Sequence, residues 1–447
     1  MNRTKKIHIS LFQNATWLFG GNSAAGIFAA IETVVIARLL GVSDYGLLAL
    51  VIAYVELLNT FFDFGVWETA TKYIGTFWSN GEHAKAQSII KLSYVVDISS
   101  GILAFLIAIL TVNIANKYLI HSPQAYELIS IYALSLLINT ANSTSDAILR
   151  VFDKFKNIAF INSLQVFSRV SLVTIVLFLG MGIKGVIFSY VLASILGFSI
   201  RIWSVSKTLH EQKLQGWWKA KLSLIRDQWK EIAWFLSNTS FIGSLRMAND
   251  RFLGILILGY FSGKDAVAYY KIARTIVKVM TRFSDPLYQA IYPELVRILN
   301  QNAFNDFLNL LKYSLRTLLK FTIPLAIIFL IFTEKITIIL FGKEFLPAMN
   351  ALRIITVAIV ISQLTFWISP ALLAIGKPGL RTFLELISSA IYIGLLFLLV
   401  PNFSYMGAAI AFLGHAIFKS SISFLSVRAS INEKKRPLEC EVYSPIH

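Results

Sequence analysis

Four cations share one otherwise apolar stretch of the chain. They lie within residues 267–291 at spacings of three, four and four residues: Lys271, Arg274, Lys278 and Arg282. In an α-helix this spacing places all four on one face, over roughly 16 Å. Exposing even two of them to lipid would cost about 5–7 kcal/mol. The face therefore either lines water and meets anions, or it is neutralised by internal ion pairs.

The residue types favour a phosphate-bearing anion as the ligand of this face. The planar fork of Arg bonds two phosphate oxygens at once, whereas Lys supplies a compact charge. A ladder of cations, in place of one site, suits an anion that is handed along a path. Arg246, in the preceding apolar stretch, joins the four cations as a candidate substrate-binding residue.

Acidic residues in other apolar stretches form a second candidate set: Glu56, Asp63, Asp146 and Asp250. Asp250 follows Arg246 by four residues, so the two can form a local pair on one helix. Two interpretations stay open for the acids. They bind a proton or Na⁺ during a transport cycle, or they neutralise the cations.

Asparagines accompany the charges. The residues expected to line a hydrated cleft are Asn22, Asn59, Asn139 and Asn142. They lie on the same faces as neighbouring acids or small residues, and such faces allow the close approach of a neighbouring helix or of water. A cleft with an acidic first wall and a basic second wall is the resulting expectation.

The composition indicates that these residues sit in a membrane. Hydrophobic residues make up 56% of the 447 residues and charged residues 15%, with a mean hydropathy of +0.67. Apolar stretches of about 20 residues, long enough to cross a hydrocarbon core, recur throughout. We predict an all-α polytopic membrane protein with twelve transmembrane helices, at 13–37, 46–66, 92–114, 127–149, 157–180, 185–204, 232–259, 267–291, 314–333, 348–374, 381–400 and 406–427.

The distribution of Lys and Arg predicts the orientation of the helices. Most of these cations fall at the two termini and in the connections after every second helix, and Arg201, near the end of the predicted helix 185–204, is counted with the connection that follows it. The opposite connections hold only Arg38, Lys117, Lys184, Lys264, Lys335 and Lys343. The positive-inside rule then places both termini in the cytoplasm. The net charge of +17 is explained by this topology, and no nucleic-acid partner is expected.

The chain also repeats itself at an offset of roughly half its length, which is the signature of duplicated membrane bundles. Asp44, Lys154 and Gly185 find counterparts at Asp265, Lys377 and Gly407. We predict two six-helix lobes related by a pseudo-twofold, parallel repeat. The expected parts are the lobes 1–204 and 232–430, a tail 431–447, and a segment 205–231 that is either an amphipathic element on the cytoplasmic surface or an ordinary polar linker.

Enzyme chemistry is not expected. The chain contains no Gly-rich phosphate loop and no His/Glu run with metal-ligand spacing, so no cofactor or metal is predicted. Its only cysteine, Cys440, lies in the polar tail. The connections between the predicted helices are too short for a catalytic domain.

Several short motifs resemble the bacterial polysaccharide transporter family, the O-antigen flippase group of a larger exporter superfamily. They are residues 36–46 (IARLLGVSDYG), 64–65 (FG), 249–254 (NDRFLG), 268–274 (AYYKIAR) and 341–345 (FGKEF). Residues 266–268 (AVA) depart slightly from the family, whose members usually show a Gly before the Tyr. The resemblance covers nearly the whole chain.

The resemblance implies a substrate and a place. The substrate would be an undecaprenyl-diphosphate-linked oligosaccharide, such as an O-antigen unit for lipopolysaccharide, flipped to the outer leaflet of the bacterial inner membrane. Its diphosphate would meet the cations, and a polysaccharide polymerase and glycosyltransferases would be partners, with membrane lipids around the protein. Two alternatives stay open: a multidrug or organic-ion exporter of the same superfamily, and a membrane glycosyltransferase or polymerase.

Overall fold

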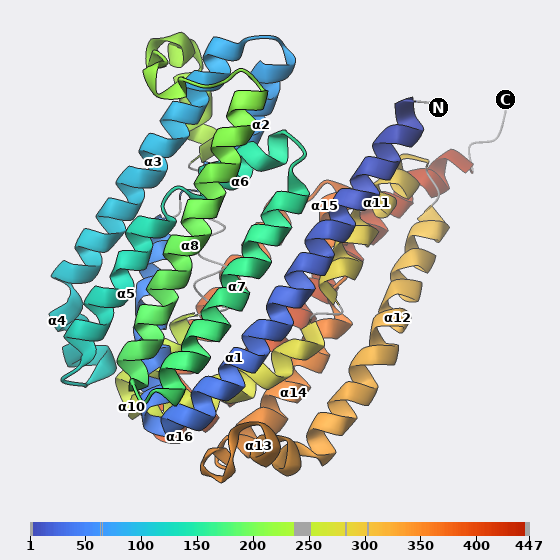
Figure 1. The fold of residues 1–447 in the computed structure, drawn as a ribbon. Helices are drawn as coiled ribbons and strands as arrows, with labels where there is room; N and C mark the ends of the chain where they lie inside the picture. The colour runs from blue at the N-terminus through green and yellow to red at the C-terminus, as the bar shows by residue number, and fades with distance from the viewer. Residues whose placement is uncertain are drawn as a thin grey trace. The chain divides into compact units, whose positions relative to one another are not determined.

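The computed structural model describes residues 3–62, 64, 66–236, 252–281, 284–301 and 304–442. Side chains are described from Ala25 to Ala429, with further gaps between residues 282 and 304. Nearly all of these residues are helical, and none of them forms a strand. The chain divides into two compact units, residues 1–256 and 257–447 (Figure 1).

The first unit is a bundle of helices. Its members are α1 (Arg3–Phe62), α2 (Val66–Ser79), α3 (His83–Leu110), α4 (Val112–Ala115), the π-helical turn η1 (Asn116–Ile120), α5 (Ala125–Asn139), α6 (Asn142–Val151), α7 (Phe155–Phe178) and α8 (Gly182–Glu211). α1 packs along α7, and α7 packs along α8. α3 lies against both α2 and α5, whereas the contact of α1 with α7 joins helices that are distant in sequence.

The second unit is also built from helices. They are α10 (Gly254–Thr281), which begins in the last residues of the first unit, α11 (Ser284–Asn300), α12 (Phe304–Ile331), α13 (Thr333–Phe341), α14 (Ala348–Leu364), α15 (Ile368–Ile375) and α16 (Pro378–Val442). α14 packs along α16, and α11 packs against α15. Short 3₁₀ turns complete the chain at η2 (Trp217–Lys219), η3 (Leu222–Gln228) and η5 (Lys343–Phe345).

Left-handed backbone positions recur at a constant offset. Four pairs of residues with positive φ are separated by 221 to 223 positions: Gly41 and Gly263, His121 and Gly342, Asp153 and Gly376, and Gly182 and Ser404. The first pair also shares its ψ, with φ/ψ of 75/179° and 77/−176°, a region that glycine alone adopts readily. These shared chain breaks support the predicted repeat.

Two predicted helices are broken in the middle. The stretch 127–149 divides into α5 and α6, and the stretch 348–374 divides into α14 and α15. At each break a threonine hydroxyl bonds a carbonyl three residues back, from Thr140 to Leu137 and from Thr365 to Ser362. Such side-chain bonds compete with the helical ladder, which hydropathy alone does not register.

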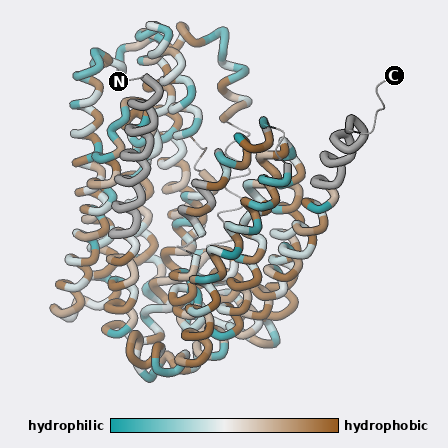
Figure 2. Tube along the Cα trace, turned by 90° about the vertical axis from the view of Figure 1, so that its right-hand side faces the viewer, coloured by the Kyte–Doolittle hydropathy of each residue, from teal (hydrophilic) through white to brown (hydrophobic). Residues whose placement is uncertain are grey.

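Seven described helical stretches are long and apolar enough to cross a membrane, judged by length and composition. Two of them, Ala25–Ser79 and Pro378–Ala429, contain the breaks at Gly41 and Ser404 and exceed the length of one span. Long parts of the helices in Figure 2 are brown, the colour of hydrophobic residues. The chain is a multi-pass membrane protein, and the number twelve stays a prediction.

Candidate functional site

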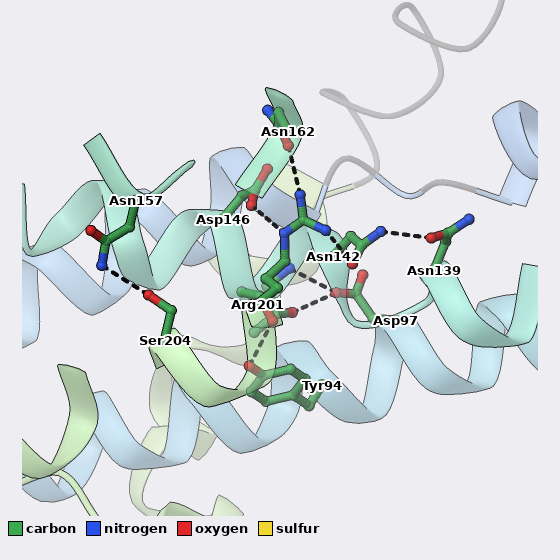
Figure 3. A network of polar contacts seen from close by, with 11 residues as sticks. Tyr94, Asp97, Asn139, Asn142, Asp146, Asn157, Asn162, Arg201 and Ser204 are labelled. Carbon is green, nitrogen blue, oxygen red and sulfur yellow. Dashed lines mark hydrogen bonds and ion pairs between the residues drawn. The ribbon is translucent and has the colours of Figure 1, made fainter. Parts of the chain in front are cut away.

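A buried arginine organises the interior of the first unit. Arg201, in α8, is only 4% exposed and donates three hydrogen bonds (Figure 3). Its Nε bonds Asp146 Oδ1 at 2.9 Å, and its two terminal nitrogens bond Asn142 Oδ1 at 2.9 Å and Asn162 Oδ1 at 2.8 Å. The guanidinium therefore joins α6, α7 and α8. A buried charge is tolerable only when it is paired and hydrogen-bonded in this way.

Asp97 stabilises the helix break beside this arginine. Its Oδ2 accepts hydrogen bonds from the Thr144 backbone N–H at 2.9 Å and from Thr144 Oγ1 at 2.6 Å. Thr144 lies in the first turn of α6, whose N–H groups have no partner within the helix. Asp97, from α3, thus caps the first turn of α6, a role that is usually taken by the residue directly before the helix. Asn142 bridges the break by donating to Asn139 Oδ1 at 3.0 Å.

A second ion pair crosses the same unit nearer its first helix. Arg169, near the middle of α7, donates to both oxygens of Glu32, with contacts of 2.8 to 3.2 Å. Glu32 is 3% exposed, and the guanidinium lies 5.0 Å from the ring centre of Tyr190. The pair is therefore bidentate and packed against an aromatic face, which is the geometry that favours Arg over Lys.

Glu56 is held by neutral donors. Tyr132 donates its hydroxyl to Glu56 Oε1 at 2.9 Å, and Asn59 donates to Oε2 at 3.2 Å. The rings of Tyr132 and Tyr190 lie 6.1 Å apart, so the Glu56 contacts continue toward the Glu32 pair. The predicted neighbours Glu56 and Asn59 are thus brought together on one helix face.

In the second unit, Arg274 is packed against aromatic side chains. Its guanidinium lies 4.5 Å from the ring centre of Phe412, and its Nη1 is 3.5 Å from the Tyr270 hydroxyl. Tyr270 is fully buried and shares a 3.2 Å hydrogen bond with the hydroxyl of Tyr392, which packs 5.1 Å from the ring of His415. We call Tyr270, Tyr392, Phe412 and His415 the aromatic box. The Phe412 ring and the Tyr270 hydroxyl together hold the guanidinium in place, which prepares its fork for a bidentate ligand.

The other predicted cations of α10 differ in exposure. Lys271 is half-buried, whereas Lys278 is exposed. The segment 266–281 contains no acidic residue. Elsewhere in this unit, Lys419 pairs with Glu385 at 2.8 Å. Five assigned positions lie outside the described side chains: Asn22, Asp63, Arg246, Asp250 and Arg282.

One assignment needs correction. Arg201 was expected in a cytoplasmic connection, as part of the positive charge at the membrane edge, but it is buried in the bundle and pairs with Asp146. Asp97 and Glu32 were not among the candidate residues. Their acidic character within apolar stretches was the available signal. Among the described residues, no group of three or more His, Cys, Asp or Glu side chains is placed to hold a metal ion.

A family model described as polysaccharide biosynthesis protein matches residues 11–299. The chain belongs to this family. It is 20% identical over 410 residues to a putative O-antigen transporter of Shigella flexneri, covering 90% of this chain and 94% of that protein. It is 23% identical over 375 residues to a probable low-salt glycan biosynthesis flippase of Haloferax volcanii, covering 84% of this chain and 74% of that protein.

Solved structures of other membrane proteins share the fold. An inward-facing multidrug resistance MATE family transporter superposes with a TM-score of 0.77 at 14% identity, over 92% of this chain and 96% of that one. The lipid II flippase MurJ, in an inward closed conformation, gives 0.74 at 19% identity, over 92% and 87%. The predicted family and all-α membrane fold are confirmed. The prediction that the chain is no enzyme agrees with these relatives, which are transporters and flippases by name.

We predict that the aromatic box positions Arg274, and that removing the Phe412 ring lowers the function of this arginine. Phe412→Leu removes the stacking face but keeps the side chain apolar, and a cation on an aromatic face contributes about 0.5–2 kcal/mol. We expect any activity of the protein that depends on Arg274 to fall by roughly 2-fold to 30-fold, with Phe412→Tyr near normal. The matched control is Phe397→Leu, at a ring that is 54% exposed on α16. Equal activity of the two leucine variants would show that the box does not position Arg274.

Proposed function

We propose that this protein is a flippase for a lipid-linked oligosaccharide. It moves an undecaprenyl-diphosphate-linked repeat unit of a surface polysaccharide from the inner to the outer leaflet of the cytoplasmic membrane. The mechanism is alternating access of the two units, with both termini in the cytoplasm. Family membership and relatives that are named an O-antigen transporter and a glycan flippase support this proposal.

The observation that carries the proposal is the placement of Arg274. A lipid-linked diphosphate carries two negative charges, and each of its tetrahedral phosphate groups presents two oxygens that a guanidinium can bond together, so it is bound best by cations that are already desolvated and oriented. Arg274 is half-buried and its guanidinium lies over the ring of Phe412, and Lys271 and Lys278 follow the same helical face at three and four residues. In this proposal Arg274 fixes the diphosphate, and the two lysines compensate its remaining charge as it moves.

The experiment removes two of these charges together. Arg274→Gln with Lys278→Gln keeps polar side chains of similar size. Each lost charge-assisted hydrogen bond is expected to cost about 1.5–3 kcal/mol, which corresponds to a roughly 100-fold or larger loss of export for the pair. Export is measured as surface polysaccharide, with the amount of protein in the membrane measured in parallel.

The second unit offers a matched control for this double variant. Arg316 and Lys320, in α12, are also an Arg and a Lys four residues apart, and both are exposed. Arg316→Gln with Lys320→Gln should leave export near the wild-type level. Normal export from a normally inserted Arg274/Lys278 variant would contradict the proposed site.

We propose Glu56 as the group that couples transport to a proton or Na⁺. Asp146 is occupied by Arg201, whereas Glu56 is held by the neutral donors Tyr132 and Asn59 and is half-buried. Glu56→Gln keeps an acceptor for Tyr132 and removes the charge. In reconstituted vesicles this variant should no longer respond to an imposed proton or Na⁺ gradient, while Glu127→Gln, in an exposed pair with Lys184, should respond normally. A full response of the Glu56 variant would exclude this role.

A drug or organic-ion exporter is the alternative on this fold, because the MATE and MurJ structures superpose on the chain almost equally well. Exporters of cationic drugs need acidic ligands, whereas residues 266–281 of α10 carry only basic charge. Growth assays with cationic drugs distinguish the two functions, since the flippase confers no resistance. Glycosyltransferases would then supply its substrate, and a polymerase of the same polysaccharide would consume the flipped unit.

A further inference from the structure

The segment that follows α8 has a fixed inner face. Leu214, Ile225 and Ile232 are almost completely buried in the core cluster of the first unit. The ring of Trp217 stacks on Tyr94 of α3 with centroids 4.7 Å apart. The predicted amphipathic linker is therefore two short 3₁₀ turns packed on α3, and its inner residues are determined by that contact.

Hydrogen bonds attach the backbone of this segment to the first turns of α3. Ser88 Oγ donates to the carbonyl of Lys221 at 3.0 Å, and Lys91 Nζ donates to the carbonyl of Ala220 at 2.9 Å. Further on, Glu231 accepts a hydrogen bond from Tyr73 at 2.7 Å and lies 3.4 Å from Lys72 Nζ. These two contacts hold the pKa of Glu231 below its ordinary value, so Glu231 is charged and engaged with α2.

The opposite face of the segment is aromatic and basic. We call its exposed side chains the linker surface: Trp218, Lys219, Lys221, Arg226, Trp229 and Lys230. Trp218 is 57% exposed and Trp229 is 49% exposed. Asp227 is the exposed acid among them. Four cations and two tryptophans thus share one short segment whose other face is committed to the core.

The contacts with α3 give the depth of the linker surface in the membrane. The cations of α3 end at Lys91, and the mainly apolar stretch from residue 92 to residue 115 carries a single charged side chain, Asp97, which is hydrogen-bonded to Thr144 inside the bundle. Since the segment is bonded to Ser88 and Lys91, it lies where the hydrocarbon core gives way to headgroups. Trp is enriched at this level, and cations there are attracted to anionic lipids.

We propose that the linker surface binds the headgroups of anionic phospholipids. The tryptophans enter the headgroup region, and Lys219, Lys221, Arg226 and Lys230 bond the lipid phosphates. This inference does not rest on the proposed function, because it concerns a different surface and different lipids. It does not depend on the orientation of the chain, since the depth follows from α3 alone.

The test follows a fluorophore on the full-length protein in an uncharged detergent. Cys440→Ser removes the only natural cysteine, and Leu224→Cys supplies an attachment point that is 44% exposed beside the surface. Short-chain phosphatidylglycerol or phosphatidylcholine is then titrated. We expect a saturable response to phosphatidylglycerol alone. Lys219→Gln, Arg226→Gln and Lys230→Gln together should raise the half-saturating concentration by about fivefold for each cation removed.

Two comparisons keep this result specific. Lys312→Gln, Arg316→Gln and Lys320→Gln remove the same residue types from exposed positions of α12 and should leave the titration unchanged. Added salt should weaken the response of the unsubstituted surface, which tests the electrostatics without any substitution. The proposal is overturned by an equal response to phosphatidylcholine, by an equal loss in the α12 variant, or by saturation with a polyprenyl diphosphate but not with phosphatidylglycerol.

Discussion

Arg201→Met is expected to destabilise the first unit by about 3 kcal/mol, the low end for breaking a buried ion pair, because the remaining Asp146 side chain is 25% exposed. The methionine fills a similar volume but leaves Asp146 with an uncompensated charge. The amide oxygens of Asn142 and Asn162 also lose their donor. The measurement is thermal or denaturant unfolding of the purified protein in detergent, read together with its level in the membrane.

Lys207→Met is the control for this variant. Lys207 lies on the same helix six residues later and is exposed, so its removal should change stability by no more than about 0.5 kcal/mol. Adding Asp146→Leu to Arg201→Met should recover part of the loss, because the unpaired carboxylate is then absent. The interpretation of Arg201 as the organising residue fails if its variant unfolds like the Lys207 variant.

The fold could be predicted from the sequence because the patterns that encode it connect residues that are close together in the chain. The cation spacing in α10 predicted one helix face, and Arg274 and Lys278 do lie on one helix. The family resemblance rests on short motifs of the same kind, and the family is confirmed. Glycine at 41 and at 263 marks the same chain break in both units, a feature that a single residue type can encode.

The side-chain pairings between helices that are distant in sequence could not be predicted in this way. Arg201 meets Asp146 across 55 positions, and Thr144 meets Asp97 across 47. No local period connects such residues, and several acids and cations compete as partners in sequence. The aromatic box could not be predicted for a similar reason, because in the sequence Phe412 and Tyr392 resemble the other large side chains of a membrane span. Both the ion pairs and the box depend on which helix faces meet.

The ion pairs of the first unit alter the expected division of labour between acids and cations. Glu32 and Asp146 are neutralised by arginines of their own unit, Arg169 and Arg201. The acidic wall that was expected opposite the α10 cations is thus reduced to Glu56 among the described acids of the candidate set. We therefore propose charge neutralisation within the unit as the role of Asp146, with Glu56 as the candidate for coupling.

The two single substitutions in the Glu32–Arg169 pair are expected to lower the free energy of unfolding by different amounts, because the two side chains differ in exposure. Arg169→Met leaves a nearly inaccessible carboxylate inside the bundle and should cost about 3–5 kcal/mol. Glu32→Met leaves an arginine whose side chain is 30% exposed, against 4% for Glu32, so its charge keeps more hydration and the loss should be smaller. The double variant, with two apolar side chains in contact, should unfold within about 1 kcal/mol of the wild type.

The double variant also separates stability from transport, which the single variants cannot do. Unfolding is measured in detergent for all four proteins of the cycle, and export is measured in cells that contain equal amounts of each. A stable, active double variant assigns the pair to the architecture of the first unit. A stable double variant without export assigns the charges to the transport cycle, where the bidentate contact between α1 and α7 must open and close. Additive losses in the two single variants, with no recovery in the double, would contradict a direct interaction of Glu32 and Arg169.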